Sequence, residues 1–543
     1  MYIQKVHIVG FLCFREFTIE FNKDKNIIVG NNGTGKSTIL DAIHLCLSGQ
    51  YRGQPIKNSL SPFLFNKDNV KTYIQACQNG ENRPELLPQI TIEVFLSGST
   101  EDVSQLALFE GDYNLDREGD SGVRLDILFN DEYQEEYTIL ANDPKGIKSV
   151  PIEYYHCVRQ TFARMPITSR SMPIRSQLVD TAAIINHRGT IDVYLNRIIN
   201  ERLSPKDRVT LSGAFRQMKE GFSSDNSLTN IVGSMDVSDT ELSLAIDPSV
   251  STNWESLLIA KINDIPFHYI GKGEQCMTKT HLVLSAKNPD SCVLLLEEPE
   301  NHLSYNNLQG FLAQIERKNE TSQIIITTHS SMVSNKLDLG NLILLGNRDN
   351  PVYFNQLEQE TRKFFQKVSG FDTLRIVLSP KTILVEGPSD ELILQKAYFQ
   401  KYKKLPLADG IDIISVFGLS FKRYISLISD LGNRVAIVTD NDGKSKKKEE
   451  RYSPFRKNNI DFFFSNNDTL RTLEPQIIEA NAHNLLSLAA ILGRNSDNLS
   501  RENLEEYMLK HKADAALAIL DTDESIIMPD YIERAIEWIK TDS

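Results

Sequence analysis

Residues 26–38 read NIIVGNNGTGKST, and this stretch decides the fold of the first half of the chain. Three apolar residues, Ile27 to Val29, predict a buried strand, and the segment TILDAIHLCL has the pattern of a helix. A strand, a GxxxxGK[ST] loop and a helix in this order form a P-loop, in which backbone N–H groups and the helix N-terminus surround phosphate oxygens. The stretch therefore predicts an α/β fold with a site for ATP and Mg²⁺.

Each part of this loop has an expected role. Lys36 should reach the β- and γ-phosphates of ATP, and Ser37 should bind the Mg²⁺ that accompanies the nucleotide. The glycines let the backbone turn its N–H groups inward. The predicted nucleotide-binding residues of the loop are Gly30, Asn31, Asn32, Gly33, Gly35, Lys36, Ser37 and Thr38.

Two later segments should complete the nucleotide site. Residues 293–300, VLLLEEPE, predict a buried strand followed by acids. Glu297 is expected to support Mg²⁺ through water, and Glu298 is expected to orient or deprotonate the attacking water as a catalytic residue. Residues 324–331, IIITTHSS, predict another buried strand that leads to His329. This histidine is either a contact for the γ-phosphate or a surface histidine.

Composition limits the class of protein. The chain has 543 residues, of which 41% are hydrophobic, so it is long enough for two to four domains with their own cores. Its net charge of -13 argues against a uniformly basic nucleic-acid binder, although a local basic patch remains compatible with it. The six cysteines form no CxxC pair, and no stretch of 18 apolar residues occurs. We expect a soluble, cytoplasmic protein.

The stretch between the two halves of the nucleotide site is long. Residues 90–96 and 123–129 alternate as half-buried strands do, and they predict an antiparallel sheet next to the nucleotide core. Residues 166–245 predict a helical insertion, which suits dimerisation, with further ATPase fold as the alternative. The segment GKGEQ at residues 271–275 should precede a helix by one turn.

Acids gather at two strand ends in the second half. VEGPSDE begins at Val385, and RVAIVTDND covers residues 434–442. The order strand, helix, strand, helix, strand predicts a parallel sheet, whose C-terminal strand ends share one crevice. Several carboxylates in one crevice repel one another unless divalent cations lie among them, and hard oxygen ligands favour Mg²⁺ or Mn²⁺.

The motifs EGPSDE and TDND resemble a Toprim domain, the metal-binding fold of topoisomerases, primases and some nucleases. The segment GKGEQ resembles the signature loop of ABC-type ATPases. Together they resemble the OLD (overcoming lysogenization defect) family over essentially the whole chain outside the insertion. The resemblance implies an SMC-like ABC ATPase head with a helical dimerisation insertion, followed by a Toprim domain with a parallel sheet. The implied parts are residues 1–165 and 246–370 for the ATPase, 166–245 for the insertion and 378–543 for the Toprim domain.

The same resemblance implies a catalytic centre with two Mg²⁺ or Mn²⁺ ions. Its implied metal ligands are Glu386, Asp390, Asp440, Asp442 and Glu474. Lys512 resembles a late lysine of the family that stabilises charge on the phosphate being cut, although neighbouring basic residues leave a surface lysine as the alternative. The implied catalytic residues of this centre are Glu386, Asp440, Asp442 and Lys512.

We expect a metal-dependent DNA endonuclease of bacterial anti-phage defence, controlled by its ATPase. Two ions roughly 4 Å apart would clamp a phosphodiester. The basic run from Lys444 to Lys457 is either a phosphate-tracking loop or a solvated face. The alternatives are a non-nucleolytic SMC-like ATPase with an inactive Toprim domain and a topoisomerase-like enzyme, for which no tyrosine is marked.

The resemblance also implies partners. It implies DNA as the substrate and a homodimer or homotetramer as the working unit. A Gabija-type branch of the family pairs with a superfamily-1 helicase, and another branch acts as a retron effector with a reverse transcriptase and its DNA–RNA product. TDND followed by lysines looks closest to the Gabija-type branch.

Overall fold

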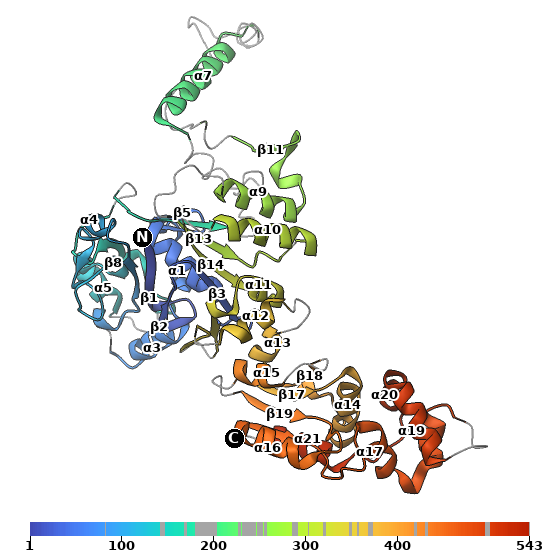
Figure 1. Ribbon diagram of the computed structural model, residues 1–543. Coiled ribbons are helices and arrows are strands. Elements are labelled where there is room, and N and C mark those ends of the chain that lie inside the picture. The colour runs from blue at the N-terminus through green and yellow to red at the C-terminus, as the bar shows by residue number, and fades with distance from the viewer. Residues whose placement is uncertain are drawn as a thin grey trace, which may run out of the picture. The chain divides into compact units, whose positions relative to one another are not determined.

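The computed structural model describes the chain as two compact units (Figure 1). One unit comprises Met1–Val333 and Asn341–Tyr353, and the other comprises Ser334–Gly340 and Phe354–Ser543. The residues left undescribed are 82, 142–146, 168–170, 180–202, 226–229, 231–245, 247–253, 255–257, 285–291, 302, 319–321, 347–349, 356–357, 368–372, 417–420, 429–432, 495–499 and 542–543. In the part that is described, no helix combines the length and apolar character needed to span a bilayer.

The first unit contains an antiparallel sheet in the order β2-β1-β6-β8-β7, with β9 also paired to β8. Its strands are β1 (Tyr2–Phe11), β2 (Phe14–Glu20), β6 (Ile90–Ser97), β7 (Glu110–Gly111), β8 (Asp120–Phe129) and β9 (Tyr155–Thr161). The antiparallel pairing of β6 with β8 confirms the predicted sheet. The prediction of half-buried strands is wrong for β6, because every residue except the last is buried.

The second sheet of this unit holds the nucleotide loop. Its order is β10-β13-β14-β3-β15-β16, and all pairs are parallel except β15 with β16. The strands are β3 (Lys25–Gly30), β10 (Arg175–Val179), β13 (Cys292–Glu297), β14 (Ser322–Thr328), β15 (Leu342–Leu345) and β16 (Pro351–Tyr353). Helix α1 (Lys36–Ser48) packs in a hydrophobic core shared with both sheets. Gln323 joins the sheets, because its side chain bonds both the N–H and the carbonyl of Ile3 at 2.8 Å.

Further helices of the described residues lie before residue 340. They are α2 (Ile56–Ser59), α3 (Lys67–Gln78), α4 (Val103–Leu106), α5 (Gln134–Ala141), α7 (Pro205–Ser223), α9 (Lys272–Leu284), α10 (Tyr305–Lys318) and α11 (Ser331–Lys336). Two short hairpins pair β4 (Gln50–Tyr51) with β5 (Gln54–Pro55) and β11 (Lys261–Ile262) with β12 (Ile265–Pro266).

Two sequence predictions for the middle of the chain need correction. The segment 166–245 is not helical throughout, because β10 lies within it and pairs in parallel with β13. Its buried residues, including Leu178, extend the hydrophobic core. Helix α7 lies in the same segment, whereas residues 180–202 of the predicted helical insertion fall outside the described residues. The loop GKGEQ does not precede a helix, because α9 already begins at Lys272.

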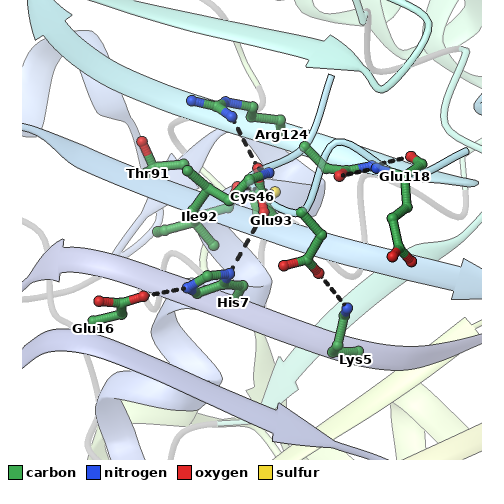
Figure 2. Close-up of polar contacts among 12 residues, drawn as sticks. Lys5, His7, Glu16, Cys46, Thr91, Ile92, Glu93, Glu118 and Arg124 are labelled. Carbon is green, nitrogen blue, oxygen red and sulfur yellow. Dashed lines mark hydrogen bonds and ion pairs between the residues drawn. The ribbon is translucent and has the colours of Figure 1, made fainter. Parts of the chain in front are cut away.

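A buried polar cluster lies on the antiparallel sheet (Figure 2). Glu93 on β6 is fully buried, with His7 on β1 and Arg124 on β8 as its cross-strand neighbours. The Arg124 guanidinium donates to Glu93 Oε1 at 3.0 Å and to Asp126 Oδ2 at 2.7 Å. The N–H of Leu115 also donates to Glu93 Oε1, at 2.9 Å. These bonds fasten the connection between β7 and β8 over the sheet.

The second unit is built on a parallel sheet in the order β18-β17-β19-β20. Its strands are β17 (Lys381–Val385), β18 (Ile411–Ser415), β19 (Arg434–Val438) and β20 (Ile460–Phe463). Its helices are α12 (Gln359–Lys367), α13 (Thr373–Leu378), α14 (Pro388–Tyr402), α15 (Phe421–Ile428), α16 (Ser445–Tyr452), α17 (Leu473–Ala480), α18 (Leu485–Ile491), α19 (Arg501–Lys510), α20 (Lys512–Asp521) and α21 (Asp530–Lys540). The parallel sheet confirms the predicted fold class. Helix α12, which the sequence analysis grouped with the ATPase, lies in this unit and packs Phe365 against Tyr424 of α15 at 5.3 Å between ring centroids.

Candidate functional site

The P-loop has the shape that its glycines allow. Gly35 precedes α1 with φ 103°, and a Cβ at this position would lie 2.3 Å from the ring of Phe14. Gly33 also has a positive φ, 77°. The Lys36 ammonium donates to the carbonyls of Gly30 at 2.9 Å and Asn31 at 3.2 Å. The lysine thus folds back over the loop, where it lies ready to exchange these carbonyls for phosphate oxygens.

The two predicted acid and histidine segments meet beside this loop. β13, β14 and β3 are successive parallel strands, so their C-terminal ends lie at one edge of the sheet. At this edge His329 Nε2 lies 3.1 Å from Glu298 Oε1. Asn301 donates to the other oxygen of Glu298 at 2.7 Å. The structure therefore brings Glu298 and His329 together, and Glu298 holds a strained backbone with φ 40°.

Glu300 is a polar residue of this site that the sequence analysis missed. Its Oε1 accepts a bond from the Thr328 hydroxyl at 2.7 Å and from the His329 N–H at 2.8 Å. Burial lowers the pKa of Lys36, while the carboxylates of Glu298, Glu300 and Glu297 oppose that shift. Glu300 is the third acid of the segment LEEPE, so its closeness in sequence to the predicted Glu297 and Glu298 indicated that it could belong to the site.

A second group of acids gathers in the other unit, at the edge where β17 and β19 end side by side. Glu386 follows β17, and Thr439 and Asp440 follow β19. The Thr439 hydroxyl donates to Glu386 Oε1, which ties the two strand ends together. Glu474 reaches the same group from the first turn of α17. Glu386, Asp390, Asp440, Asp442 and Glu474 are called the carboxylate cluster below.

The electrostatics of the carboxylate cluster are unfavourable without a cation. Burial raises the pKa of Asp440 to about 8, and repulsion from neighbouring carboxylates adds to the rise. Burial likewise raises the pKa of Asp390 to about 6, with Glu386 as the next cause. Glu474 is 4% exposed, and its Oε2 is buried without a hydrogen-bond partner, as is Oδ1 of Asp440. Buried carboxylates of this kind require a positive partner.

Two lysines supply part of that charge. Lys512 Nζ lies 2.9 Å from Glu474 Oε1. Lys448 Nζ lies 3.0 Å from Asp442 Oδ2 and 3.5 Å from Glu386 Oε1. The five carboxylates of the cluster therefore meet two ammonium groups, and the charge is not balanced.

The predicted ligands do not all lie equally deep. Asp442 is the outermost, because its side chain is 64% exposed and meets Glu386 through Lys448. One oxygen of Asp390 accepts the N–H of Gly387 at 3.0 Å, so this residue also caps α14. Tyr531 of α21, which was not predicted for the site, is buried, and its pKa is raised by burial and by the cluster acids. Nothing in the sequence of α21 indicated that this tyrosine would lie within the electrostatic influence of these acids.

The donor set fits hard divalent cations, since it consists of carboxylates with unpartnered buried oxygens. These residues fit such a cation in the type of their donor atoms and in their negative charge. As the side chains stand, no group of three or more His, Cys, Asp or Glu residues within the described part of the chain is arranged to hold a metal ion.

Family models match both units. A model described as AAA domain matches residues 5–163, and another AAA domain model matches residues 280–334. A model described as Overcoming lysogenization defect protein-like, TOPRIM domain matches residues 378–442. The resemblance to the OLD family and the predicted fold class, an ATPase head followed by a Toprim domain, are thereby confirmed. Domains of these two kinds in general use ATP and a divalent metal.

Individual relatives are similar over shorter stretches. Endonuclease GajA of Bacillus cereus (strain VD045) is 26% identical over 157 residues, which cover 28% of this chain and 27% of that protein. A structure of the C-terminal region of the Burkholderia pseudomallei OLD protein is 19% identical, covers 30% of this chain and 98% of that chain, and has a TM-score of 0.25. An SMC head bound to the C-winged helix domain of ScpA is 14% identical, covers 66% of this chain and 100% of that chain, and has a TM-score of 0.33. The chain thus spans about a quarter of the length of the endonuclease that it matches.

Proposed function

We propose that this chain is an ATP-binding, divalent-metal-dependent DNA endonuclease. The carboxylate cluster supports this most directly, because buried acids at the C-terminal edge of a parallel sheet carry unpartnered oxygens and a raised pKa of about 8 at Asp440. The similarity to an endonuclease over 157 residues adds to it. An acid held in its neutral form without metal becomes a ligand when a cation enters.

The reaction we propose is hydrolysis of a phosphodiester. Two divalent ions bound among Glu386, Asp390, Asp440, Asp442 and Glu474 would activate a water and stabilise the leaving oxygen. Thr439 orients the carboxylate of Glu386 by donating to it. Lys512, half exposed and 2.9 Å from Glu474, is the residue that would meet charge developing on the phosphate.

DNA is the proposed substrate, because a basic face lies directly beside the carboxylate cluster. Helix α16 follows the DND motif, and its lysines at 446 and 447 are exposed. Arg451 is also exposed and lies one turn further along the helix from Lys447. Such a stripe can contact successive phosphates on a protein whose net charge is -13.

ATP is proposed to regulate this activity through the P-loop and the Glu298–His329 pair. We further propose a homodimer or homotetramer and a role in anti-phage defence. A superfamily-1 helicase or a retron reverse transcriptase with its DNA–RNA product would be the partner in the respective branches of the family. The similarity to GajA favours the first branch. A non-nucleolytic ATPase stays as the second candidate, because the described cluster has no ready-made three-donor metal geometry.

A plasmid-cleavage assay with Mg²⁺ or Mn²⁺ tests the proposal. Nicked or linear products with free 5′-phosphates are expected from the parent and not from a Glu386→Gln variant. A parent that binds DNA and ATP but never cuts would establish the second candidate instead. Protein-linked DNA would indicate topoisomerase chemistry.

A further inference from the structure

The lysine run beside the carboxylate cluster contains one residue that behaves differently from the others. Lys446 and Lys447 are exposed, whereas the side chain of Lys448 is 12% exposed. Its Nζ donates to the Thr439 hydroxyl at 3.0 Å and to the main-chain carbonyl of Asp440. Together with the contacts to Glu386 and Asp442, this places one ammonium group among four oxygens.

This position is fixed by the start of helix α16. The N–H of Ser445 donates to Asp468 Oδ1 at 2.8 Å, which anchors the first turn, and the N–H of Lys448 donates to the carbonyl of Lys444 at 3.1 Å. The helix therefore directs Lys448 inward and leaves Lys447 facing solvent. Burying an ammonium group costs free energy unless oxygens replace its water, and here they do.

A lysine in this place competes with a metal ion. Glu386 Oε1 and Asp442 Oδ2 are oxygens that a divalent cation would use, and a positive charge 3.0 to 3.5 Å from them repels an entering cation. Without metal, however, the same charge offsets the repulsion among the acids. The two requirements are compatible if the ammonium leaves when the ion arrives.

We propose that Lys448 is the internal counter-cation of the carboxylate cluster, which occupies the metal-binding oxygens in the metal-free protein and is displaced by the divalent ion. It is a positioning residue, and the inference rests on the proposed metal-dependent function. Displacement would free the oxygens of Glu386 and Asp442 that the ammonium group now contacts. Lys448 therefore keeps the site folded at the expense of metal affinity.

Titration of the nucleotide-free full-length protein with MnCl₂ in a calorimeter tests this. Lys448→Gln should bind Mn²⁺ about tenfold more tightly than the parent, which corresponds to about 1.4 kcal/mol. In EDTA its melting temperature should be lower than that of the parent, and saturating Mn²⁺ should remove the difference. Lys448→Arg, which keeps the charge, should behave as the parent does. Lys447→Gln removes the same charge one residue away and should leave Mn²⁺ affinity unchanged.

The outcomes separate the inference from the proposed function. Equal or weaker Mn²⁺ binding by Lys448→Gln would overturn the inference, and so would a melting temperature lowered by the same amount with and without metal, since that indicates a structural role. In either case the metal site itself would stand, provided that an Asp440→Asn, Asp442→Asn double variant abolishes Mn²⁺ binding. If the parent shows no Mn²⁺ binding that this double variant removes, the proposed function fails and the inference fails with it.

Discussion

The molecule buries acids in two places, and the two places treat them differently. On the antiparallel sheet, Glu93 lies between Arg124 and His7, and one oxygen accepts two hydrogen bonds (Figure 2). In the carboxylate cluster, five acids meet two lysines, and Oε2 of Glu474 and Oδ1 of Asp440 are left without partners. Even Glu93 has one oxygen without a hydrogen bond, 3.8 Å from His7 Nδ1. The two clusters therefore differ mainly in how far positive charge balances the acids, and less in whether every carboxylate oxygen has a hydrogen bond.

The way in which the acids are paired distinguishes a structural polar cluster from a candidate binding site. Register creates the first cluster, since Glu93 faces Arg124 and Thr91 faces Asp126 directly across two strands. Each acid there has a basic or hydroxyl neighbour, because Thr91 donates to Asp126 at 2.7 Å. In the second cluster the acids come from the ends of β17 and β19 and from helices α14 and α17, and they converge on one another. Convergent like charge is costly for folding, and this cost supports the proposal that a cation binds there.

The largest effect is expected from Asp440→Asn. Cleavage should fall by about 10³-fold or more, because a central ligand is lost. The melting temperature in EDTA should stay equal or rise, since burial of this carboxyl, whose pKa is raised to about 8, costs folding free energy that an amide does not. Plasmid-cleavage rates and thermal unfolding measure the two effects. Retained cleavage, or a clear loss of metal-free stability, would place this cluster in the same structural class as that of Glu93.

Arg124→Met should strongly destabilise the first unit. It leaves the buried Glu93 carboxylate without its cation, which costs about 3–5 kcal/mol. Urea unfolding measures the loss. Arg164→Met is the matched control, since Arg164 and Asp112 are 60% and 66% exposed and such a pair is worth less than about 1 kcal/mol. Similar losses in both variants would contradict the view that the buried cluster depends on charge balance.

Metal removal should distinguish the two clusters directly. EDTA should lower the melting temperature of the parent, because a ligand present at 100 times its dissociation constant stabilises by about 2.7 kcal/mol. The drop should vanish in the Asp440→Asn, Asp442→Asn double variant and persist in Glu93→Gln. A drop that instead persists in the double variant would mean that the metal binds elsewhere.

The smallest effect concerns pH. Burial raises the pKa of Glu93 from 4.5 to about 7, so charging it destabilises the folded state and its contribution to stability falls as pH rises between these values. Between pH 5 and pH 6 the free energy of unfolding should fall by about 1 kcal/mol on this account. His7 acts in the opposite direction, because burial lowers its pKa. The difference between the parent and Glu93→Gln in urea unfolding isolates the glutamate, and equal slopes would refute its raised pKa.

The sequence predicted those parts of the fold that depend on local pattern. The P-loop, the parallel sheet of the second unit and the grouping of Glu386 with Asp440 follow from strand, loop and helix order. The Glu93 cluster could not be predicted, because it depends on the register between distant strands. The inward direction of the Lys448 side chain could not be predicted either, because Lys448 looks like Lys446 and Lys447 in the sequence. Only the anchored first turn of α16 makes its position different from theirs.

The place of β3 in its sheet has a consequence for synthesis of the chain. Both neighbours of this strand, β14 and β15, are encoded about 300 residues after it. At translation rates of about 5–20 residues per second, β14 and β15 are synthesised about 15–60 s after the P-loop strand. During that interval its apolar residues and open edges are available to chaperones or to other nascent chains. The nucleotide site is therefore among the last parts of the first unit to be completed, and contacts this distant in sequence also slow refolding.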